Sequence, residues 1–208
     1  MQASRLPNAG GAQDYSLPVS QLGVAGEIKS GAPEAIAGVN NTVRETVIAN
    51  LEASRAGRVS SSFGTFAGRE ALTNEALAAN QSPWPLGYTP SVRPMAVGEQ
   101  FNMVIDANQA QGLRGPGGFG TFSNIPNQPF ARDTLAITEE FKSDISFLQR
   151  YEVVQAFDAL EGPIGPQIDQ VTGRLLEGSK TISQLDLQLP WNQRTQYLKP
   201  VGTPVPLK

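Results

Sequence analysis

Apolar residues early in the chain repeat with the spacing of a helix. Over residues 34–56 they recur every three or four positions, at Ile36, Val39, Val43, Val47 and Leu51, with Ile48 beside Val47. This spacing predicts one apolar stripe on a helix that begins behind Pro33 and ends near Gly57. A second helix is predicted over residues 68–80. Together they form a small helical arm, and its stripe must be covered either by the rest of the chain or by a partner.

Farther along the chain, the apolar period shortens to the alternation of strands. Residues 100–106, QFNMVID, predict a strand with at least one buried face. Residues 151–157, YEVVQAF, are rich in strand formers, and RTQYLKP at 194–200 predicts the last strand before a proline-rich tail. In TEEFKSDISFLQ, residues 138–149, the apolar spacing of four and three behind a capping threonine predicts a short helix.

Segments rich in glycine and proline separate these elements and suggest the domain boundaries. The four prolines of residues 81–98 predict an extended segment, which Trp84 and Tyr88 would order. The two prolines of EGPIGP at 161–166 cannot continue a central strand, so we expect a turn there. The chain is therefore predicted to be α+β, with short antiparallel strands and long Gly/Pro loops. Its predicted parts are a flexible linker (1–33), a helical region (34–90) and the α+β domain (91–208).

Composition excludes several classes of function. The net charge of −3 provides no broad field for nucleic acid or an anionic membrane. There is no apolar run of ~18 residues and no signal peptide, so an export address would lie on a larger polypeptide. The chain has no Cys and no His, which excludes disulfides, thiolate and histidine catalysis, and most zinc sites. Chemistry must come from carboxylates, amides, hydroxyls or cationic side chains.

A stiff loop over residues 112–132 combines glycines, aromatic rings and two arginines. Arg114 and Arg132 could bind a pyrophosphate in bidentate fashion. The backbone amides near Gly117 and Gly118 could approach the same oxygens. The rings of Phe119, Phe122 and Tyr197 could stack on a base or a nicotinamide. Taken alone, such a loop is more often a structural turn pinned by buried rings, and each arginine is more often part of a surface ion pair.

The order of the short motifs resembles a known toxin family. GPGGF, PFAR, YEV, EGPIGP and TQY follow one another over about residues 95–200. This order resembles the tuberculosis necrotizing toxin (TNT) family of NAD glycohydrolases. These are C-terminal toxin domains of large secreted bacterial proteins, with relatives among contact-dependent inhibition toxins and other polymorphic toxins.

The resemblance assigns roles to individual residues. Gln196 matches the family's active-site glutamine, and Arg132 in PFAR matches a family arginine. Arg114 stands near the arginine of the family's Asp-Arg-Tyr-Gly motif, although this chain reads GLRG there. The family's active-site histidine has no counterpart, and an insert over residues 167–190 separates EGPIGP from RTQY.

The resemblance implies hydrolysis of the N-glycosidic bond of NAD⁺ or NADP⁺, which would be substrates and not cofactors, without a metal. We expect catalytic roles for Gln196, Arg132 and Glu161. Gln196 would act on the ribose and the attacking water, and Glu161 is the second candidate for that role. We expect substrate binding by Arg114, Gly117, Gly118, Phe119, Phe122 and Tyr197. It further implies a cognate immunity protein, secretion within a larger protein, and action in the cytoplasm of a target cell.

Three alternatives stay open from the sequence. An ADP-ribosyltransferase toxin would use the same NAD but need an ordered carboxylate near the ribose, for which Glu161 or Glu152 is available. An RNase toxin could work with Arg, Lys, Tyr and carboxylates, although the acidic balance disfavours RNA binding. A non-catalytic structural or adhesin module would need the Gly/Pro loops only for shape.

Overall fold

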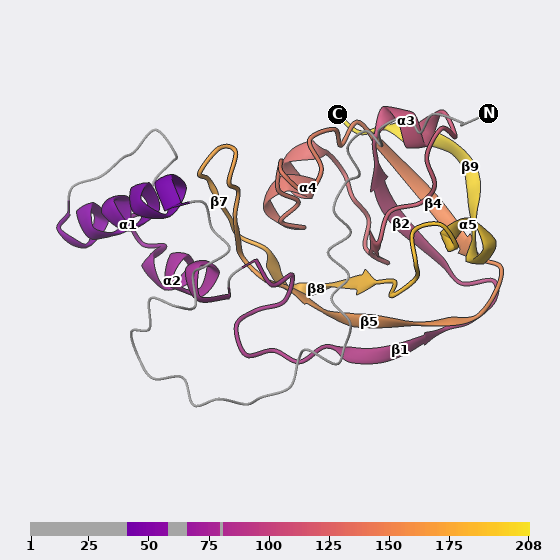
Figure 1. The fold of residues 1–208 in the computed structure, drawn as a ribbon, viewed down its shortest axis with the longest axis horizontal. Coiled ribbons are helices and arrows are strands. Elements are labelled where there is room, and N and C mark those ends of the chain that lie inside the picture. The colour runs from indigo at the N-terminus through magenta and orange to yellow at the C-terminus, as the bar shows by residue number, and fades with distance from the viewer. Residues whose placement is uncertain (1–40, 58–65, 80) are drawn as a thin grey trace, which may run out of the picture. The chain divides into compact units, whose positions relative to one another are not determined.

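The computed structural model describes residues 41–57, 66–79 and 81–208 (Figure 1). The predicted linker, and the part of the first predicted helix before Asn41, lie outside the described residues. The two predicted helices are present as α1 (Asn41–Arg55) and α2 (Glu70–Ala79). None of the helices in the described ranges is long and apolar enough to cross a membrane.

From Asn41 onward, where the structure describes it, the apolar stripe of the helical arm is covered by the chain itself. Val47 of α1 and Leu77 of α2 are buried together with Phe66. They pack against Ile168 and Leu175, which belong to a small hairpin of β6 (Gln167–Ile168) and β7 (Leu175–Leu176). Burying a large apolar side chain stabilises a fold by roughly 1.5–3 kcal/mol. This cluster therefore ties the arm to the C-terminal part of the chain.

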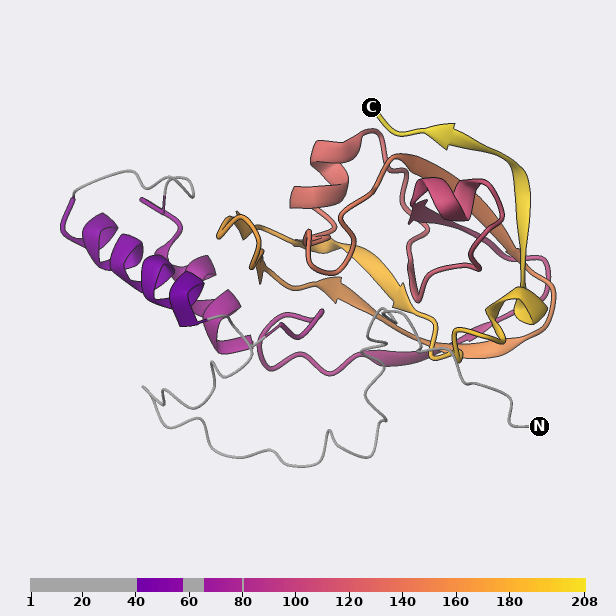
Figure 2. The ribbon, with the colours of Figure 1, turned by 45° about the horizontal axis from the view of Figure 1, so that its top comes forward.

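Two antiparallel sheets build the rest of the fold (Figures 1 and 2), and the predicted α+β class is confirmed. The three-stranded sheet has the order β2-β4-β9 and the four-stranded sheet the order β1-β5-β8-β3. The strands of the first are β2 (Gln100–Ile105), β4 (Phe147–Val153) and β9 (Leu198–Pro206). Those of the second are β1 (Ser91–Met95), β3 (Phe119–Gly120), β5 (Phe157–Ile164) and β8 (Ser179–Asp186). Short helices α3 (Ala107–Ala110), α4 (Gln128–Asp133) and α5 (Arg194–Tyr197) lie between strands.

The main core joins these two sheets. The predicted inward face of β2, with Phe101, Met103 and Ile105, is buried as expected. It packs with Tyr151 and Val153 of β4 and with a set from the four-stranded sheet and the segment after it: Met95, Ala159, Leu185 and Leu187. Alternation along β2 and β4 sends every second side chain to this core.

The predicted helix over residues 138–149 is wrong. Thr138 does start one turn, since its carbonyl accepts the N–H of Lys142 at 3.0 Å. The Asp144 carboxylate then accepts the N–H of Ser146, which a helix would direct to the carbonyl of Lys142. That carbonyl instead accepts from Arg132, and β4 begins at Phe147. Side-chain competitors for backbone groups thus end the helix after one turn.

The predicted turn at EGPIGP is also wrong, because residues 161–164 are the end of β5. The pairing of β1 with β5 ends where Ser91 lies opposite Glu161. Beyond Glu161, β8 is the only strand among the described residues that pairs with β5. Pro163 lies there, next to an irregularity in register with β8. A proline is tolerated at such a position because its missing N–H interrupts no ladder.

The predicted strand over RTQYLKP, residues 194–200, is wrong in its first half. RTQY forms α5, and the strand begins only at Leu198. The N–H of Gln196 is accepted by the carbonyl of Gln193, which closes the helical turn. The predicted proline-rich tail is the main part of β9, whose place at the edge of its sheet tolerates proline. Likewise, the insert over residues 167–190 contains the β6–β7 hairpin and β8.

Candidate functional site

A cavity of about 490 Å³ opens between the loop after α3 and the junction of α5 with β9. Arg114 and its neighbours form one wall, and Thr195 of α5 and Lys199 of β9 contribute to the other. Gln149 and Tyr151 of β4 also line it. The cavity therefore combines two cationic side chains with uncharged polar groups, a set suited to an anionic ligand with polar attachments.

A capping box shapes the loop that carries Arg114. The Asp106 carboxylate accepts the N–H of Gln109 at 2.7 Å, and the Gln109 side-chain oxygen accepts the N–H of Asp106 at 3.1 Å. The Gln109 amide nitrogen then donates to the carbonyl of Gly115 at 2.8 Å. Beyond it, the N–H of Gly117 meets the sulfur of Met103 at 3.0 Å. The loop is held at both of these points.

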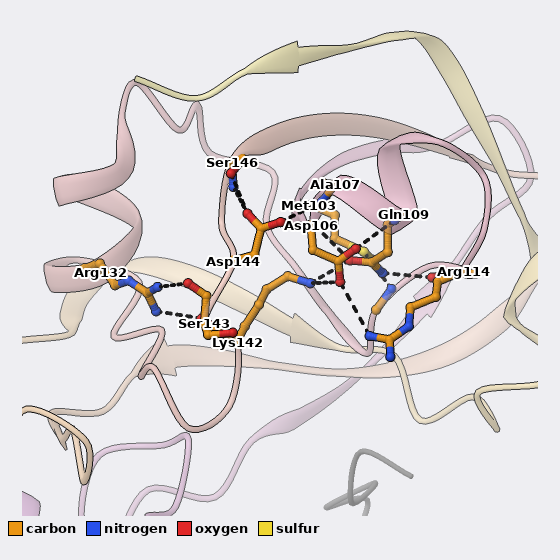
Figure 3. A network of polar contacts seen from close by, with 12 residues as sticks. Met103, Asp106, Ala107, Gln109, Arg114, Arg132, Lys142, Ser143, Asp144 and Ser146 are labelled. Atoms are coloured by element: carbon orange, nitrogen blue, oxygen red, sulfur yellow. Dashed lines mark hydrogen bonds and ion pairs between the residues drawn. The ribbon is translucent and has the colours of Figure 1, made fainter. Parts of the chain in front are cut away.

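Lys142 and Arg114 approach the same carboxylate from two sides (Figure 3). The Lys142 ammonium lies 3.5 Å from Asp106 Oδ2 and donates to Gln109 Oε1 at 2.6 Å. Arg114 Nη1 lies 3.9 Å from the same Oδ2. Burial lowers the pKa of Lys142 below its usual value, while the charge of Asp106 opposes that shift. The Lys142 side chain is 17% exposed and that of Arg114 is 61% exposed, so only Arg114 is open to a ligand.

Arg132 supports the loop that carries Lys142. Its guanidinium donates to the carbonyls of Ile137 and Lys142 from Nη1 and to that of Ser143 from Nη2, at 2.8–2.9 Å. Figure 3 shows it on the side of Lys142 that faces away from Arg114. Arg132 thus touches the network through the backbone and is not among the residues that line the cavity.

Arg132→Ala is expected to lower the free energy of unfolding by about 2 kcal/mol, because three carbonyls lose a charged donor. Arg132→Lys would recover less than half of this loss, since an ammonium cannot reproduce the planar fork of the guanidinium. Urea unfolding followed by circular dichroism measures both variants. An unchanged unfolding midpoint for Arg132→Ala would contradict a loop-holding role.

Asp144 ties the same loop to α3 and makes this region sensitive to acid. Its carboxylate accepts from the Ser146 hydroxyl and, at 2.8 Å, from the N–H of Ala107. These hydrogen bonds, led by that of Ser146, lower the pKa of Asp144 below its usual value. The stability that this carboxylate contributes is complete above the unfolded-state pKa and is lost as pH falls through the folded-state value.

Asp144→Ala is therefore expected to lower stability at neutral pH and to reduce the further loss of stability between about pH 5 and pH 2. Thermal unfolding across this range measures the effect. Asp158→Ala removes an exposed carboxylate from β5 and serves as the matched control. Parallel acid profiles for wild type and Asp144→Ala would disprove the assignment.

Close backbone contacts bring the glycine loop against α5. A side chain at Gly118 would lie 3.0 Å from the Arg194 guanidinium, and one at Gly115 would lie 3.4 Å from Thr195. Arg194 is buried, and its Nε donates to the carbonyl of Leu189 at 3.0 Å. Gln196 is exposed on α5, next to Thr195 in the cavity wall. The structure thus brings Arg114, the glycine loop and the helix of Gln196 together.

The predicted stacking rings and Glu161 lie in other surroundings. Phe119 packs edge-on against Phe141 and Tyr197 against Phe157, with ring centres 5.6 and 5.9 Å apart. Phe122 lies under the Arg93 guanidinium, 4.3 Å from it. Arg93 in turn pairs with Glu161 at 3.3 Å and with Glu99 at 2.8 Å. None of Phe119, Phe122, Tyr197 and Glu161 lines the cavity.

Sequence reasoning missed several polar residues of the site: Asp106, Gln109, Lys142, Gln149, Tyr151, Thr195 and Lys199. One of them carried a readable signal. Gln149 is in phase with Tyr151 and Val153 on the buried face of β4, where a polar residue is unusual. Tyr151 and Thr195 belong to the YEV and TQY motifs, although the resemblance gave these two residues no role. For Asp106, Gln109, Lys142 and Lys199 no comparable pattern exists. Among the described residues, no group of three or more acidic side chains is placed to hold a metal ion.

Comparison with known proteins finds similarity among solved structures. No protein-family model matches the sequence, and no curated protein matches it. The structure of Tne2 in complex with Tni2 is 30% identical to this chain, with a TM-score of 0.50 over 60% of this chain and 97% of the other.

Two more distant structures are also similar. Rhs1-CT in complex with its cognate immunity protein RhsI1 is 21% identical, with a TM-score of 0.34 over 56% of this chain and 80% of the other. Tse6 in complex with Tsi6 is 14% identical, with a TM-score of 0.36 over 78% and 98%. Similarity this remote supports no argument about the site. The 30% identity to Tne2 over 97% of its length shows that this chain belongs to the Tne2 family of polymorphic-toxin C-terminal domains.

Proposed function

We propose that this toxin domain hydrolyses the N-glycosidic bond of NAD⁺ or NADP⁺, releasing nicotinamide and ADP-ribose or its phosphate. The observation that carries the proposal is the placement of Arg114 on a cavity that also borders α5, the helix of Gln196. These are two of the residues that the TNT resemblance assigned to the site. Membership in the Tne2 family supports the same reaction class.

The reaction requires little covalent chemistry from the protein. The bond between the ribose C1′ and the pyridinium nitrogen breaks, and its electron pair neutralises the ring. Water then adds to C1′ and releases a proton. The protein must hold the pyrophosphate, orient the ribose and steady the oxocarbenium-like charge. A chain without histidine can meet these needs, since the leaving group departs neutral and requires no proton.

The residues of the cavity divide these tasks. Arg114 and Lys199 would bind the pyrophosphate, because both line the cavity and the Arg114 side chain is largely exposed. Gln196 would position water or the ribose. Asp106 aligns Arg114, while Lys142 and Arg132 hold the supporting loop. Glu161 is engaged with Arg93, so we assign it no direct role. Transfer of ADP-ribose to a protein is disfavoured for the same reason, since Glu161 and Glu152 do not line the cavity.

A cognate immunity protein is the proposed partner. Tne2 was solved with Tni2, and Rhs1-CT with its cognate immunity protein RhsI1. An enzyme that consumes NAD would harm the cell that makes it, so an inhibitor that binds tightly is required. We further propose that the domain travels as part of a larger secreted protein and acts in the cytoplasm of the target cell.

The decisive experiment follows nicotinamide release from NAD⁺ and from NADP⁺ by chromatography, over a wide range of protein concentration. Release that scales with protein would establish the reaction. Radiolabel from adenine-labelled NAD⁺ appearing on a protein acceptor would indicate ADP-ribosyl transfer instead. If NAD⁺ is untouched while RNA is degraded, the chain is an RNase toxin. If nothing is consumed and expression is harmless, the non-catalytic alternative holds.

A further inference from the structure

Two buried polar side chains of β4 face the cavity described above. Gln149 and Tyr151 are two residues apart, so they lie on the same side of the strand, and both line the cavity. Gln149 is 2% exposed and Tyr151 is 5% exposed. Polar side chains buried to this degree normally have hydrogen-bond partners, so the partners of these two are informative.

The orientation of the Gln149 amide is determined by its neighbours. Its Nε2 donates to the carbonyl of Arg150 at 2.8 Å and to that of Val201 at 3.0 Å. Because carbonyl oxygens only accept, the nitrogen must face them, and the side-chain oxygen must point the other way. Within the described part of the chain, no group donates to Gln149 Oε1. The cavity wall therefore contains a fixed acceptor that is available to a ligand.

Tyr151 complements this acceptor with a donor. Burial, assisted by the negative charge of Asp106, raises the pKa of its hydroxyl to about 12. The group therefore remains a neutral O–H at any physiological pH. Its hydroxyl makes no hydrogen bond to any residue in the described ranges. The lining of one cavity thus includes a donor and an acceptor, neither of which is hydrogen-bonded to a described residue.

We propose that Gln149 and Tyr151 bind the carboxamide of the nicotinamide ring. Gln149 Oε1 accepts from the carboxamide NH₂, and the Tyr151 hydroxyl donates to the carboxamide carbonyl. This inference rests on the proposed function and makes Gln149 and Tyr151 residues that determine specificity for the leaving group. Both lie in β4; Gln149 is outside the motifs of the resemblance, and Tyr151 begins the YEV motif, to which the resemblance assigned no role.

An adenine edge also presents an NH₂ group beside an acceptor, but the surroundings favour nicotinamide. The same cavity is lined by Thr195 of α5, the helix whose Gln196 we assign to the ribose at the scissile bond. Nicotinamide is attached directly to that ribose, whereas adenine lies at the far end of the dinucleotide.

Substrate analogues separate the two hydrogen bonds. The 3-acetylpyridine analogue of NAD⁺ replaces the NH₂ group by methyl and keeps the carbonyl. Gln149→Leu is expected to lower kcat/KM for NAD⁺ about tenfold and to leave kcat/KM for the acetylpyridine analogue within threefold. Tyr151→Phe is expected to lower both values about tenfold, since both substrates retain the carbonyl. Tyr88→Phe, in an exposed tyrosine away from the cavity, is the matched control and should change neither.

Each other outcome has a defined meaning. Gln149→Leu can fail to fold, because it also removes the donor to two carbonyls, whereas Tyr151→Phe breaks no bond within the described chain. Unchanged kinetics of a folded Tyr151→Phe would overturn the proposal. A different result would show adenine at this position. If the wild type prefers NAD⁺ to nicotinamide hypoxanthine dinucleotide and Gln149→Leu loses that preference in kcat/KM, the proposal is wrong.

The proposal and the proposed function can also fail separately. If the wild-type protein does not hydrolyse NAD⁺, saturation-transfer NMR with free nicotinamide still tests the carboxamide site. Binding to wild type that weakens at least fivefold in Tyr151→Phe would support the site without the activity. The absence of nicotinamide binding by the wild type would overturn it.

Discussion

Arg114→Ala is expected to lower kcat/KM for NAD⁺ about 10²-fold, the size of effect seen when a preorganised electrostatic contact is lost. The side chain has only one charged contact among the described residues, at 3.9 Å from Asp106, and it is 61% exposed at the cavity. Removing it should therefore leave the free energy of unfolding nearly unchanged. A large loss of turnover at constant stability is the signature of a ligand contact, measured by steady-state kinetics beside urea unfolding.

Two further variants sharpen the test of Arg114. Arg114→Lys keeps the charge but not the bidentate fork, so it should recover only part of the rate. Arg174→Ala removes another exposed arginine, outside the cavity, and should leave kcat/KM for NAD⁺ unchanged. If Arg114→Ala keeps kcat/KM within threefold of wild type, the pyrophosphate does not bind at this wall.

Gln196→Ala is expected to lower kcat about 10²-fold with little change in KM, because a group that positions water or the ribosyl cation acts mainly in the transition state. The residue is exposed on α5, so its truncation leaves no buried group without a partner. Initial rates of nicotinamide release over a range of NAD⁺ concentrations separate kcat from KM.

The same helix region provides a close control for Gln196. Gln193 precedes α5 and makes no capping hydrogen bond with its side chain. Gln193→Ala should therefore retain full activity. Equal losses in the two variants would mean that truncation disturbs α5 as a whole, and near-normal turnover of Gln196→Ala would remove this residue from the mechanism.

The two loops of the site depend on each other through charged side chains. Arg132 holds the backbone that presents Lys142, and Lys142 contacts both Asp106 and Gln109. Gln109 in turn holds the carbonyl of Gly115, next to Arg114. A change at Arg132 can therefore reach Arg114 without either residue touching the other. We therefore expect Arg132, which does not line the cavity, to influence activity only through this chain of contacts.

Local pattern alone predicted much of the framework. The three-and-four spacing of apolar residues identified α1, and the alternation in QFNMVID identified β2 together with its buried face. Both rest on short-range geometry, because burial of one face depends on the period of the element. The absence of Cys and His likewise limited the possible chemistry, and the order of the Gly/Pro motifs indicated the toxin family before any fold was known.

The tertiary structure decided what depends on contacts between distant segments. The apolar spacing of residues 138–149 suits a helix, but Arg132 and Asp144 compete for its backbone groups. The prolines of β5 and β9 are tolerated because each strand has an open side at those positions, which depends on strand order. In the same way, two backbone carbonyls fix the Gln149 amide, because its Nε2 donates to the carbonyl of Arg150 and to that of Val201, 52 residues away. The side-chain oxygen is thereby left to accept from a ligand. Short-range periodicity thus determined the elements, while long-range hydrogen bonds determined where they end and which side chains a substrate can reach.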